Sequence, residues 1–453
     1  MPCQLSITQL IGILAATPIN LSEEGASAVC TGITTDTRRL QPGHLFLALR
    51  GEKFDGHDFA GVAVEKGAIA VIADRRAAPQ LNGVPQLQVE DTLLAYQQIA
   101  RWWRDQFDIP VIAVTGSVGK TTTKELIAAV LSTKGNVLKT QANYNNEIGV
   151  PKTLLELGSE HDYAVIELAM RGPGQIALLA QIARPTVGVI TNVGTAHIGL
   201  LGSEQAIANA KCELLAEMPS TSVAVLNHDN QRLIETAATV WQGQTLTYGL
   251  EGGDLRGQMI DSETLEVEGM QLPIPLAGRH NALNYLGALA VAKQLEVDWA
   301  SLTKGLSVEL PSGRSRRYDL PNDIVILDET YNAGLESMLA ALQLLAQTPG
   351  KRHIAVLGAM KELGERSPEF HQQVGKMAQQ LNLDALLVLV NDPEAEAIAT
   401  GAASLPTECF SSYEALVKRL EELVRSGDRL LFKASRSVGL DRVVNQFREI
   451  VSG

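Results

Sequence analysis

Short runs of β-branched and small apolar residues, separated by segments with helical spacing, dominate the central part of this chain. The runs that predict buried strands are residues 111–114, 164–166, 187–191 and 223–226. Strands that are apolar along their whole length are typical of a parallel sheet with helices on both faces. The central part is therefore predicted to be an α/β domain on a parallel sheet, and ligands of such domains bind at the carboxyl ends of the strands.

The strongest chemical signal is the segment VIAVTGSVGKTTT, where the first of these strands passes through a glycine-rich turn into a helix predicted at residues 120–131. Backbone N–H groups of such a turn cradle phosphates, Lys120 supplies a positive charge, and a threonine hydroxyl can bind Mg²⁺. The strict motif has a glycine where this chain has Val114. A glycine-rich turn with a merely solvated lysine is the alternative. The residues assigned to nucleotide binding are Thr115, Gly116, Ser117, Val118, Gly119, Lys120, Thr121 and Thr122.

The alternation of strand and helix patterns restarts after a linker of sequence ELPSGRSRR at residues 309–317. The strand runs beyond it are residues 324–327, 354–357, 386–390 and 430–433. Before the central part, the pattern predicts helices at residues 6–14 and 93–107 and strands at residues 45–49 and 70–73. Two open α/β domains joined by a short linker favour hinge closure over a ligand.

A chain of 453 residues is long for one core, and roughly three domains are expected. We therefore predict an α/β fold in three domains. Residues 1–108 form a smaller N-terminal α/β domain, residues 109–311 a central P-loop mononucleotide-binding α/β domain, and residues 312–453 a C-terminal Rossmann-like α/β domain.

Composition narrows the classes of function. A net charge of −13 argues against nucleic acid as a partner, because phosphate backbones require basic surface. The four cysteines are scattered without a CxxC pair, as in proteins of reducing compartments. The apolar patch at residues 10–16 has no Lys or Arg before it, which argues against a secretory signal, and no apolar run is long enough for a membrane span. We expect a cytoplasmic protein.

Polar residues follow the predicted strands at their carboxyl ends. Glu167 ends one strand and is placed to share a Mg²⁺ with Thr121, because carboxylate and hydroxyl oxygens suit that ion. A solvated strand-end carboxylate is the alternative for Glu167, and a structural histidine is the alternative for His197 after the next strand. The amide-rich turn NYNNEIGVP contains Asn145 and Asn146, whose side chains offer donors and acceptors to sugars and phosphates.

Two further segments leave their roles open. In the first domain, TTDTRR places hydroxyls, a carboxylate and an arginine ahead of a strand, and it reads either as a grip on a nucleotide sugar or diphosphate or as a polar turn. In GRHNALN, at the start of a helix predicted at residues 282–295, Asn281 serves either adenine recognition or helix capping. Spacing alone does not decide between these readings.

Taken together, the motifs resemble the Mur ligases, the ATP-dependent amide-forming enzymes of peptidoglycan synthesis. The resemblance covers nearly the whole chain, and NNEIGVP and YNA are its most discriminating parts. The segments that carry it are TTDTRRLQPGHLFLALRGEKFDGHDFA, TGSVGKTTT, NYNNEIGVP, ELAMRGPGQI, TNVGTAHI, AGRHNALN, PSGR, LDETYNAG, LGAMKELG and KASRS. The family usually reads D-D-S-Y-N-A-N-P where this chain has residues 328–335, so Glu329, Gly334 and Leu335 depart from the pattern.

The resemblance implies roles for individual residues. Lys120 and its loop bind the β- and γ-phosphates, Thr121 with Glu167 holds one Mg²⁺, and His197 with Lys211 joins a second. Lys211, expected at the start of a helix, is typically carbamylated by CO₂ in this family. Asn281 and Asn284 contact adenine, Arg314 the γ-phosphate and Asp328 the ribose region; Lys120, Lys211, His197 and Arg314 are the catalytic residues. The substrate-binding residues are Thr35, Asp36, Thr37, Arg38, Asn145, Asn146, Tyr331, Asn332, Lys433, Ser435 and Arg436.

The implied reaction joins UDP-N-acetylmuramoyl-tripeptide to D-alanyl-D-alanine through an acyl phosphate, with ADP and phosphate released. ATP and Mg²⁺ are the implied cofactors, and we expect a monomer. Two rival hypotheses remain open. One is a related amide ligase, either another Mur type or the folylpolyglutamate type, and the other is a P-loop ATPase that ligates nothing.

Overall fold

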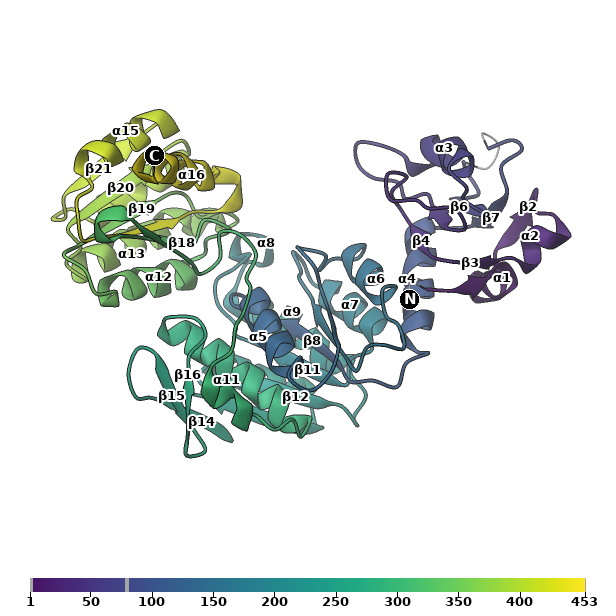
Figure 1. Ribbon diagram of the computed structural model, residues 1–453, viewed down its shortest axis with the longest axis horizontal. Coiled ribbons are helices and arrows are strands. Elements are labelled where there is room, and N and C mark those ends of the chain that lie inside the picture. Colours follow the sequence, from purple (N-terminus) through teal and green to yellow (C-terminus); the bar gives the residue numbers. More distant parts are fainter. Residues whose placement is uncertain (1–2, 78–80, 453) are drawn as a thin grey trace.

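The computed structural model describes residues 3–77 and 81–452 of the chain. Three sheet-containing units follow one another in a row, with the N-terminal unit at one end, the C-terminal unit at the other and the central unit between them (Figure 1). The boundaries predicted after residues 108 and 311 lie in the segments that join these units, and they stay predictions.

The N-terminal unit has a small sheet of strand order β2-β7-β6-β5-β4, in which only β2 runs antiparallel to its neighbour. Ser6 caps α1 through a capping box with Gln9, so the helix begins at Ile7, one residue after the predicted start. Its elements are β1 (Leu5–Ser6), α1 (Ile7–Leu14), β2 (Thr17–Ile19), α2 (Glu23–Ser27), β3 (Val29–Cys30), β4 (Ile33–Thr34), β5 (Leu45–Leu47), η1 (Gly56–Phe59), α3 (Ala60–Glu65), β6 (Ala70–Asp74), β7 (Gln86–Val89) and α4 (Thr92–Arg104).

The central unit has the sheet order β16-β15-β14-β13-β12-β11-β8-β10-β9, parallel from β9 to β14 and antiparallel beyond. Its strands are β8 (Val111–Thr115), β9 (Val137–Lys139), β10 (Tyr163–Glu167), β11 (Val187–Ile190), β12 (Val223–Asn227), β13 (Gln244–Gly249), β14 (Leu255–Met259), β15 (Thr264–Val267) and β16 (Met270–Pro273). Its helices are α5 (Lys120–Leu131), α6 (Gly149–Leu154), α7 (Gln175–Ala183), α8 (Ile198–Leu201), α9 (Glu204–Ala216), α10 (Gln231–Val240), α11 (Arg279–Gln294) and η3 (Ala300–Lys304).

The continuous apolar runs have the expected cause, because the central sheet is buried on both faces. Along β8, Ile112 and Val114 pack in the core that contains residues of α5 and α11. Val111 and Ala113 point the other way, into the core that contains residues of α7 and α9. Successive strand residues face opposite sides, so a strand covered by two helical layers must be apolar throughout.

The C-terminal unit has the sheet order β17-β18-β22-β19-β20-β21, parallel except for the edge strand β17. Its strands are β17 (Arg316–Leu320), β18 (Ile324–Asp328), β19 (Arg352–Leu357), β20 (Ala385–Leu389), β21 (Thr407–Phe410) and β22 (Asp428–Lys433). Its helices are η4 (Pro321–Asp323), α12 (Leu335–Gln347), η5 (Gly364–Arg366), α13 (Ser367–Gln380), η6 (Pro393–Ala395), α14 (Glu396–Gly401), α15 (Tyr413–Leu423), η7 (Arg436–Val438) and α16 (Asp441–Ser452).

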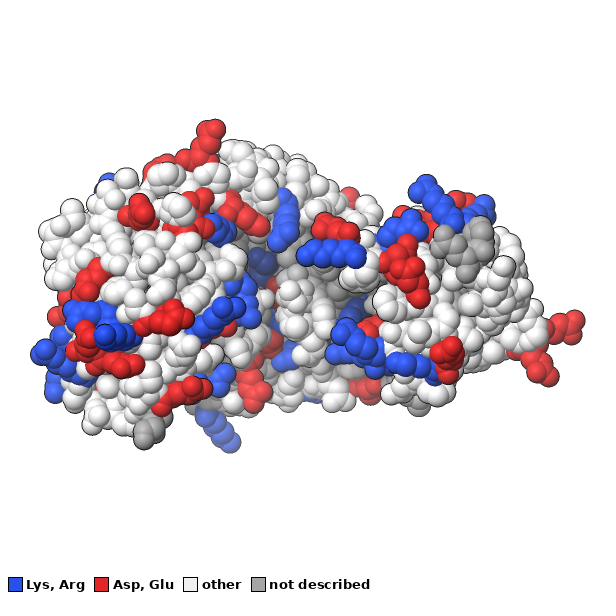
Figure 2. Space-filling view, turned by 90° about the horizontal axis from the view of Figure 1, so that it is seen from above, with Lys and Arg blue, Asp and Glu red and all other residues white. Residues whose placement is uncertain are grey.

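The predicted α/β fold with several largely parallel sheets is confirmed, with three local corrections. Lys211 lies in the middle of α9, so its expected place at the start of a helix was wrong. The helix expected at residues 282–295 already begins at Arg279, and the strand expected at residues 45–49 ends at Leu47. Over the described residues, no helix combines the length and apolar character needed to span a membrane. Acidic and basic side chains are interspersed on the face in Figure 2, and blue ones gather around the hollows between units.

Candidate active site

The turn between β8 and α5 packs directly against side chains of the loop after β11 and of α11, and this close packing requires glycine. A Cβ added at Gly116 would lie 1.9 Å from Thr191 Oγ1, and one at Gly119 would lie 2.6 Å from Asn284 Oδ1. Gly119 has a φ of 80° and stands directly before the first residue of α5. The predicted turn therefore places its N–H groups and the helix N-terminus at the carboxyl end of β8, as an anion site requires.

The loop after β11 holds this turn in place. Val118 N–H donates to Asn192 Oδ1 at 3.0 Å, and Thr191 Oγ1 donates to Val118 O at 2.6 Å. Lys120 Nζ donates to Gly116 O at 2.8 Å, so its charge lies over the turn. Burial lowers the pKa of Lys120, and the nearby Glu167 carboxylate opposes that shift. The lysine is therefore half-buried and bonded to the turn, which favours the phosphate-binding reading over a merely solvated side chain.

Glu167 ends β10 next to the turn and is 2% exposed. Its Oε1 accepts a hydrogen bond from Asn145 Nδ2 at 2.7 Å, whereas its Oε2 is buried without a partner. Thr115 Oγ1, at the end of β8, is likewise buried and unpartnered. Buried polar atoms are normally satisfied, so unpartnered oxygens at neighbouring strand ends fit a hard cation such as Mg²⁺. Residues 3–77 and 81–452 contain no group of three or more His, Cys, Asp or Glu that could hold a metal, so any such cation also needs other ligands.

Lys211 and His197 lie near Lys120, because the charge of Lys120 lowers the pKa of both side chains. Lys211 is 2% exposed, and its side chain makes no hydrogen bond or ion pair within the described part of the chain. Burial, and then the charge of Lys120, lowers the pKa of Lys211 well below its ordinary value. Burial also lowers the pKa of His197, against the effect of Glu362. Glu167 also affects the pKa of Lys120. The structure thus brings together Lys120, Glu167, His197 and Lys211, as the resemblance implied.

Asn281 and Asn284 lie on α11 behind the turn. Asn284 Oδ1 accepts a hydrogen bond from Thr123 Oγ1 at 3.2 Å, and Asn281 Nδ2 donates to Ala277 O at 2.8 Å. The residue that caps α11 is Gly278, so the capping alternative for Asn281 is wrong. The adenine contact of both asparagines stays a prediction.

The C-terminal unit places a second polar group at the ends of β18 and β22. Lys433 Nζ donates to Asn332 O at 3.0 Å and lies 3.8 Å from Glu329 Oε2. The Arg314 guanidinium stacks over the Tyr331 ring at 3.7 Å, and its Nε is buried without a partner in the described structure. Arg314 also lowers the pKa of Lys120, which shows that the group adjoins the phosphate loop.

The remaining C-terminal candidates adjoin this group. Asp328, at the end of β18, accepts hydrogen bonds from Thr330 N and Oγ1, and burial raises its pKa. Ser435 Oγ accepts the Lys361 N–H at 2.9 Å, and the Arg436 guanidinium lies 5.7 Å from the Tyr331 ring. These residues lie together, although no sequence pattern indicated which contacts they make.

The predicted N-terminal loop and the second asparagine make local contacts. Arg38 donates to both carboxylate oxygens of Asp36, and these bonds lower the pKa of Asp36 to about 2. Thr37 O accepts a hydrogen bond from Lys66 Nζ at 2.9 Å. The turn-like alternative for residues 35–38 is thus seen in the geometry, and the substrate role stays a prediction. Asn146 Oδ1 accepts the N–H of Gly149, the first residue of α6.

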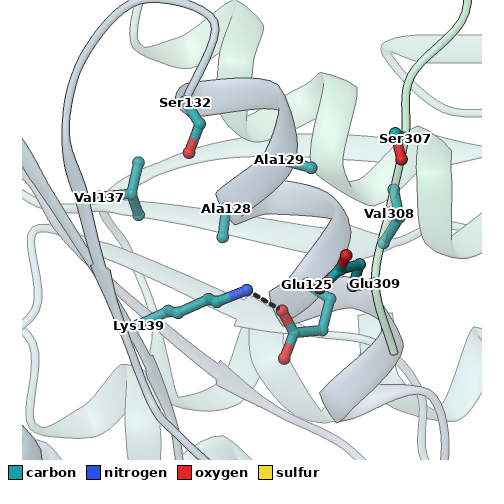
Figure 3. Close-up of a pocket in the computed structure, with 9 residues that line it drawn as sticks. All are labelled: Glu125, Ala128, Ala129, Ser132, Val137, Lys139, Ser307, Val308 and Glu309. Carbon is teal, nitrogen blue, oxygen red and sulfur yellow. Dashed lines mark hydrogen bonds and ion pairs between the residues drawn. The ribbon is translucent and has the colours of Figure 1, made fainter. Parts of the chain in front are cut away.

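Two carboxylates at the site were not singled out from the sequence. Glu336 on α12 accepts the Thr195 N–H at 2.7 Å, and Glu362 contacts His197 Nδ1. The segment LGAMKELG, which contains Glu362, was the one available signal. A separate cavity of about 300 Å³ lies further along α5, where Glu125 pairs with Lys139 beside Ser307 and Glu309, the first residue of the linker (Figure 3). It does not include the phosphate loop.

A phosphate-binding turn at the strand ends of one α/β unit, faced by basic groups of a second, defines a nucleotide-dependent enzyme of several domains. The family described as Mur ligase middle domain matches residues 114–292. The Mur ligase, glutamate ligase domain matches residues 313–436, and the Mur ligase family, catalytic domain matches residues 29–104. The chain belongs to the Mur ligase family, and it is therefore an ATP-dependent ligase.

Known proteins resemble the chain over its length. The UDP-N-acetylmuramoyl-tripeptide–D-alanyl-D-alanine ligase of Synechocystis sp. is 61% identical over 98% of this chain and 94% of its own. A crystal structure of MurF from Acinetobacter baumannii has a TM-score of 0.89 at 31% identity and covers 99% of both chains. MurF ligase from Thermotoga maritima, in complex with ADP, has a TM-score of 0.83 at 33% identity and covers 92% of this chain and 97% of its own.

Proposed function

We propose that this chain joins UDP-N-acetylmuramoyl-tripeptide to D-alanyl-D-alanine in peptidoglycan synthesis, with ATP converted to ADP and phosphate. The observation that carries the proposal is the identity of 61% with the Synechocystis ligase over 98% of the chain, because it extends through all three units. The rival amide ligases share the fold, but a non-ligating ATPase has no need of the first and third units.

The chemistry follows from the stability of carboxylates. A carboxylate does not accept an amine, because its leaving group would be oxide. In the proposed reaction one carboxylate oxygen of the tripeptide attacks the γ-phosphorus of ATP, and the bond to ADP breaks. The free amine of D-alanyl-D-alanine then attacks the acyl carbon of the acyl phosphate. Inorganic phosphate departs with that carboxylate oxygen, and the amine loses a proton.

The residues of this chain act mainly by positioning and charge. The turn at residues 115–119 and Lys120 hold the phosphates, and Arg314 neutralises charge from the opposite unit. Glu167 and Thr121 would hold Mg²⁺, as would His197 and Lys211, and the ion, when bound, neutralises phosphate charge. Asn281 and Asn284 would contact adenine, and Asp328 the ribose region.

Lys211 would enter the site as a carbamate. The neutral amine attacks the carbon of CO₂ and loses one proton, which turns a cationic side chain into a carboxylate-like ligand. Lys211 is buried, and its side chain lacks a partner in the described structure. Its pKa is lowered well below the ordinary value, so the neutral amine that this step needs forms readily. A buried lysine ammonium beside Lys120 would otherwise be costly.

The substrate ends are assigned to opposite sides of the nucleotide. The loop with Thr35, Asp36, Thr37 and Arg38 would hold the uridine diphosphate end. The group of Tyr331, Asn332, Lys433, Ser435 and Arg436 would hold the incoming dipeptide, with its carboxylate near the cationic side chains. Asn145 and Asn146 would lie toward the peptide end of the acceptor.

Two wider expectations belong to this proposal. All four cysteines are free, as expected for a protein of the cytoplasm, where reduced thiols are the rule. A monomer is expected because each substrate has an assigned place within one chain. Light scattering of the purified protein at micromolar concentration tests the second point, and a stable dimer would contradict it.

A panel of acceptors tests the substrate assignment. UDP-N-acetylmuramoyl acceptors of increasing peptide length are each offered D-alanyl-D-alanine or a single amino acid, with ATP and Mg²⁺. We expect product only from the tripeptide acceptor with the dipeptide. Product from the dipeptide acceptor with one amino acid would identify the preceding ligase, and product only from a folate would contradict the assignment of the first unit.

A further inference from the structure

Glu362 of the C-terminal unit reaches into the central unit at His197. One of its carboxylate oxygens contacts His197 Nδ1, and the other lies 3.7 Å from Arg171 Nε. Its backbone oxygen accepts the Gly199 N–H at 2.9 Å. Glu362 is thus attached to the central unit by its side chain and by its main chain.

The backbone at both ends of this contact has an unusual conformation. His197 has a φ of 66° and Glu362 a φ of 62°, in the left-handed region that residues other than glycine seldom adopt. Such residues cluster at functional sites, where the surrounding structure holds them in place. The two left-handed residues aim the imidazole and the carboxylate at each other across the junction of the units.

Two glycines beside the contact fix how closely the units approach. A Cβ added at Gly199 would lie 2.5 Å from Gly364 N, and one at Gly364 would lie 2.8 Å from Gly199 Cα. The main chains of α8 and η5 therefore meet without side chains between them. Gly199 lies two residues after His197, and Gly364 lies two residues after Glu362. The close contact of the two main chains therefore sets the distance between the imidazole and the carboxylate.

An imidazole has two nitrogens, and a partner on one determines what the other can do. With a carboxylate at Nδ1, the proton resides on Nδ1 and the Nε2 lone pair stays available. Histidines that ligate metals usually donate their other N–H to a carboxylate or carbonyl, which fixes the ring and raises its basicity. Lys120 and Lys211 lie close enough to His197 to lower the pKa of its imidazole, so His197 belongs to the same group of side chains as the proposed phosphate and metal ligands.

We propose that Glu362 is a positioning residue that orients His197 toward the cation bound with ATP, so that docking of the C-terminal unit completes the metal site. This inference rests on the proposed function, because it takes His197 as a ligand of that cation. It makes the metal site a product of two units. Binding of Mg²⁺–nucleotide and docking of the C-terminal unit then favour each other.

Glu336 provides a matched control for Glu362. It also belongs to the C-terminal unit, and its carboxylate accepts the Thr195 N–H at 2.7 Å and lies 3.2 Å from Thr195 Oγ1. Thr195 lies two residues before His197, so Glu336→Ala loosens the same junction without touching the imidazole. A loss that arises only from weaker docking of the units should appear in both variants.

The first readout is the ring of His197, followed by ¹⁵N NMR of protein labelled at histidine, with His197→Gln used for assignment. We expect the wild type to show Nδ1–H and an unprotonated Nε2. Glu362→Ala should shift His197 toward a mixture of tautomers, Glu362→Gln should do so less, and Glu336→Ala should shift it least, because it weakens docking but keeps the carboxylate that faces Nδ1. Unchanged His197 resonances in both Glu362 variants, or equal shifts in Glu362→Ala and Glu336→Ala, would overturn the proposal.

The second readout is the Mg²⁺ concentration that gives half of the maximal ADP binding, measured by calorimetry on the full chain. We expect an increase of about tenfold or more for Glu362→Ala and less than about twofold for Glu336→Ala. If His197→Gln leaves this concentration unchanged, the metal role of His197 in the proposed function is wrong. If His197→Gln raises it and neither Glu362 variant does, only the positioning role of Glu362 is wrong.

Discussion

Asn145 Nδ2 donates to Glu167 Oε1 at 2.7 Å and leaves Oε2 of the same carboxylate buried without a partner. One oxygen of this carboxylate is thus held at the end of β10 and the other stays free, close enough to the phosphate loop for the carboxylate to oppose the lowering of the Lys120 pKa by burial. The Asn145 amide thus fixes the orientation of the Glu167 carboxylate and of its free oxygen. Hydrogen-bond partners of metal ligands act in the same way.

Removing that amide should weaken metal binding more than it weakens the fold. Asn145→Ala should raise the Mg²⁺ concentration for half-maximal ligase rate about tenfold. Asn146→Ala is the control, because Asn146 accepts the N–H of Gly149 and makes no bond to Glu167. It should cost about 1 kcal/mol of stability and leave the Mg²⁺ dependence unchanged, even if it weakens binding of the acceptor. Equal Mg²⁺ dependence in the two variants would show that Asn145 does not orient Glu167.

Lys120→Ala should abolish turnover and keep the fold. The substitution removes the cation bonded to Gly116 O at the turn, and we expect at least about a hundredfold loss of ligase rate. Alanine is well tolerated at a helix start, so thermal unfolding should change little. Lys134→Ala, an exposed lysine beyond the other end of α5, should keep the wild-type rate. A normal rate in Lys120→Ala would contradict the phosphate-loop assignment.

Lys211 should carry ¹³C label when the protein is equilibrated with ¹³CO₂. Because its pKa is lowered, the neutral amine persists to lower pH than for ordinary lysine, and the carbamate should be lost as acid protonates the amine. Lys211→Ala should be nearly inactive and partly rescued by short-chain carboxylates. Lys124 is an internal control, since it is equally buried but donates to Thr140 O at 2.7 Å and pairs with Glu125. A ¹³C carbamate signal that survives in Lys211→Ala would refute the assignment.

His371 predicts a pH dependence of stability. It is buried, its Nε2 accepts the Met360 N–H at 2.9 Å, and burial lowers its pKa. Below about pH 6.5 the unfolded chain therefore binds a proton at His371 that the folded chain does not bind. The contribution of neutral His371 to stability is full above about pH 6.5 and decreases as the pH drops below that value. Urea unfolding between pH 8 and 5 should show a steeper loss in the wild type than in His371→Gln. Parallel curves would contradict a neutral, buried His371.

Local pattern sufficed where one residue run determines one element. The helix predicted at residues 120–131 has the same bounds in the structure, because Gly119 ends the turn and the following residues are buried along α5. The parallel strands β8, β10, β11 and β12 were equally visible, since burial on both faces leaves few polar positions. The parallel strands β9 and β13 were not predicted, because they are more exposed. The antiparallel strands β14–β16 were not predicted, because short strands with alternating exposure give a weak signal.

Contacts between units lay beyond the reach of sequence reasoning. Glu336 and Glu362 are charged residues in helix and loop segments, and nothing local shows that they meet Thr195 and His197 from another unit.

The exact start of a helix was also hard to predict. Lys211 was placed at a helix start, although the cap of α9 is Ser203, whose side chain accepts the Ala206 N–H. Asn281 allowed two interpretations, and the observed cap at Gly278 excluded the capping role.

The most direct test of the account follows one oxygen atom. The tripeptide acceptor is prepared with ¹⁸O in its terminal carboxylate and is incubated with the enzyme, ATP, Mg²⁺ and D-alanyl-D-alanine. The account predicts one ¹⁸O from the carboxylate in the phosphate released per amide bond formed, because the acyl phosphate breaks between carbon and oxygen. Phosphate whose new oxygen comes from water, released without an amide product, would contradict it.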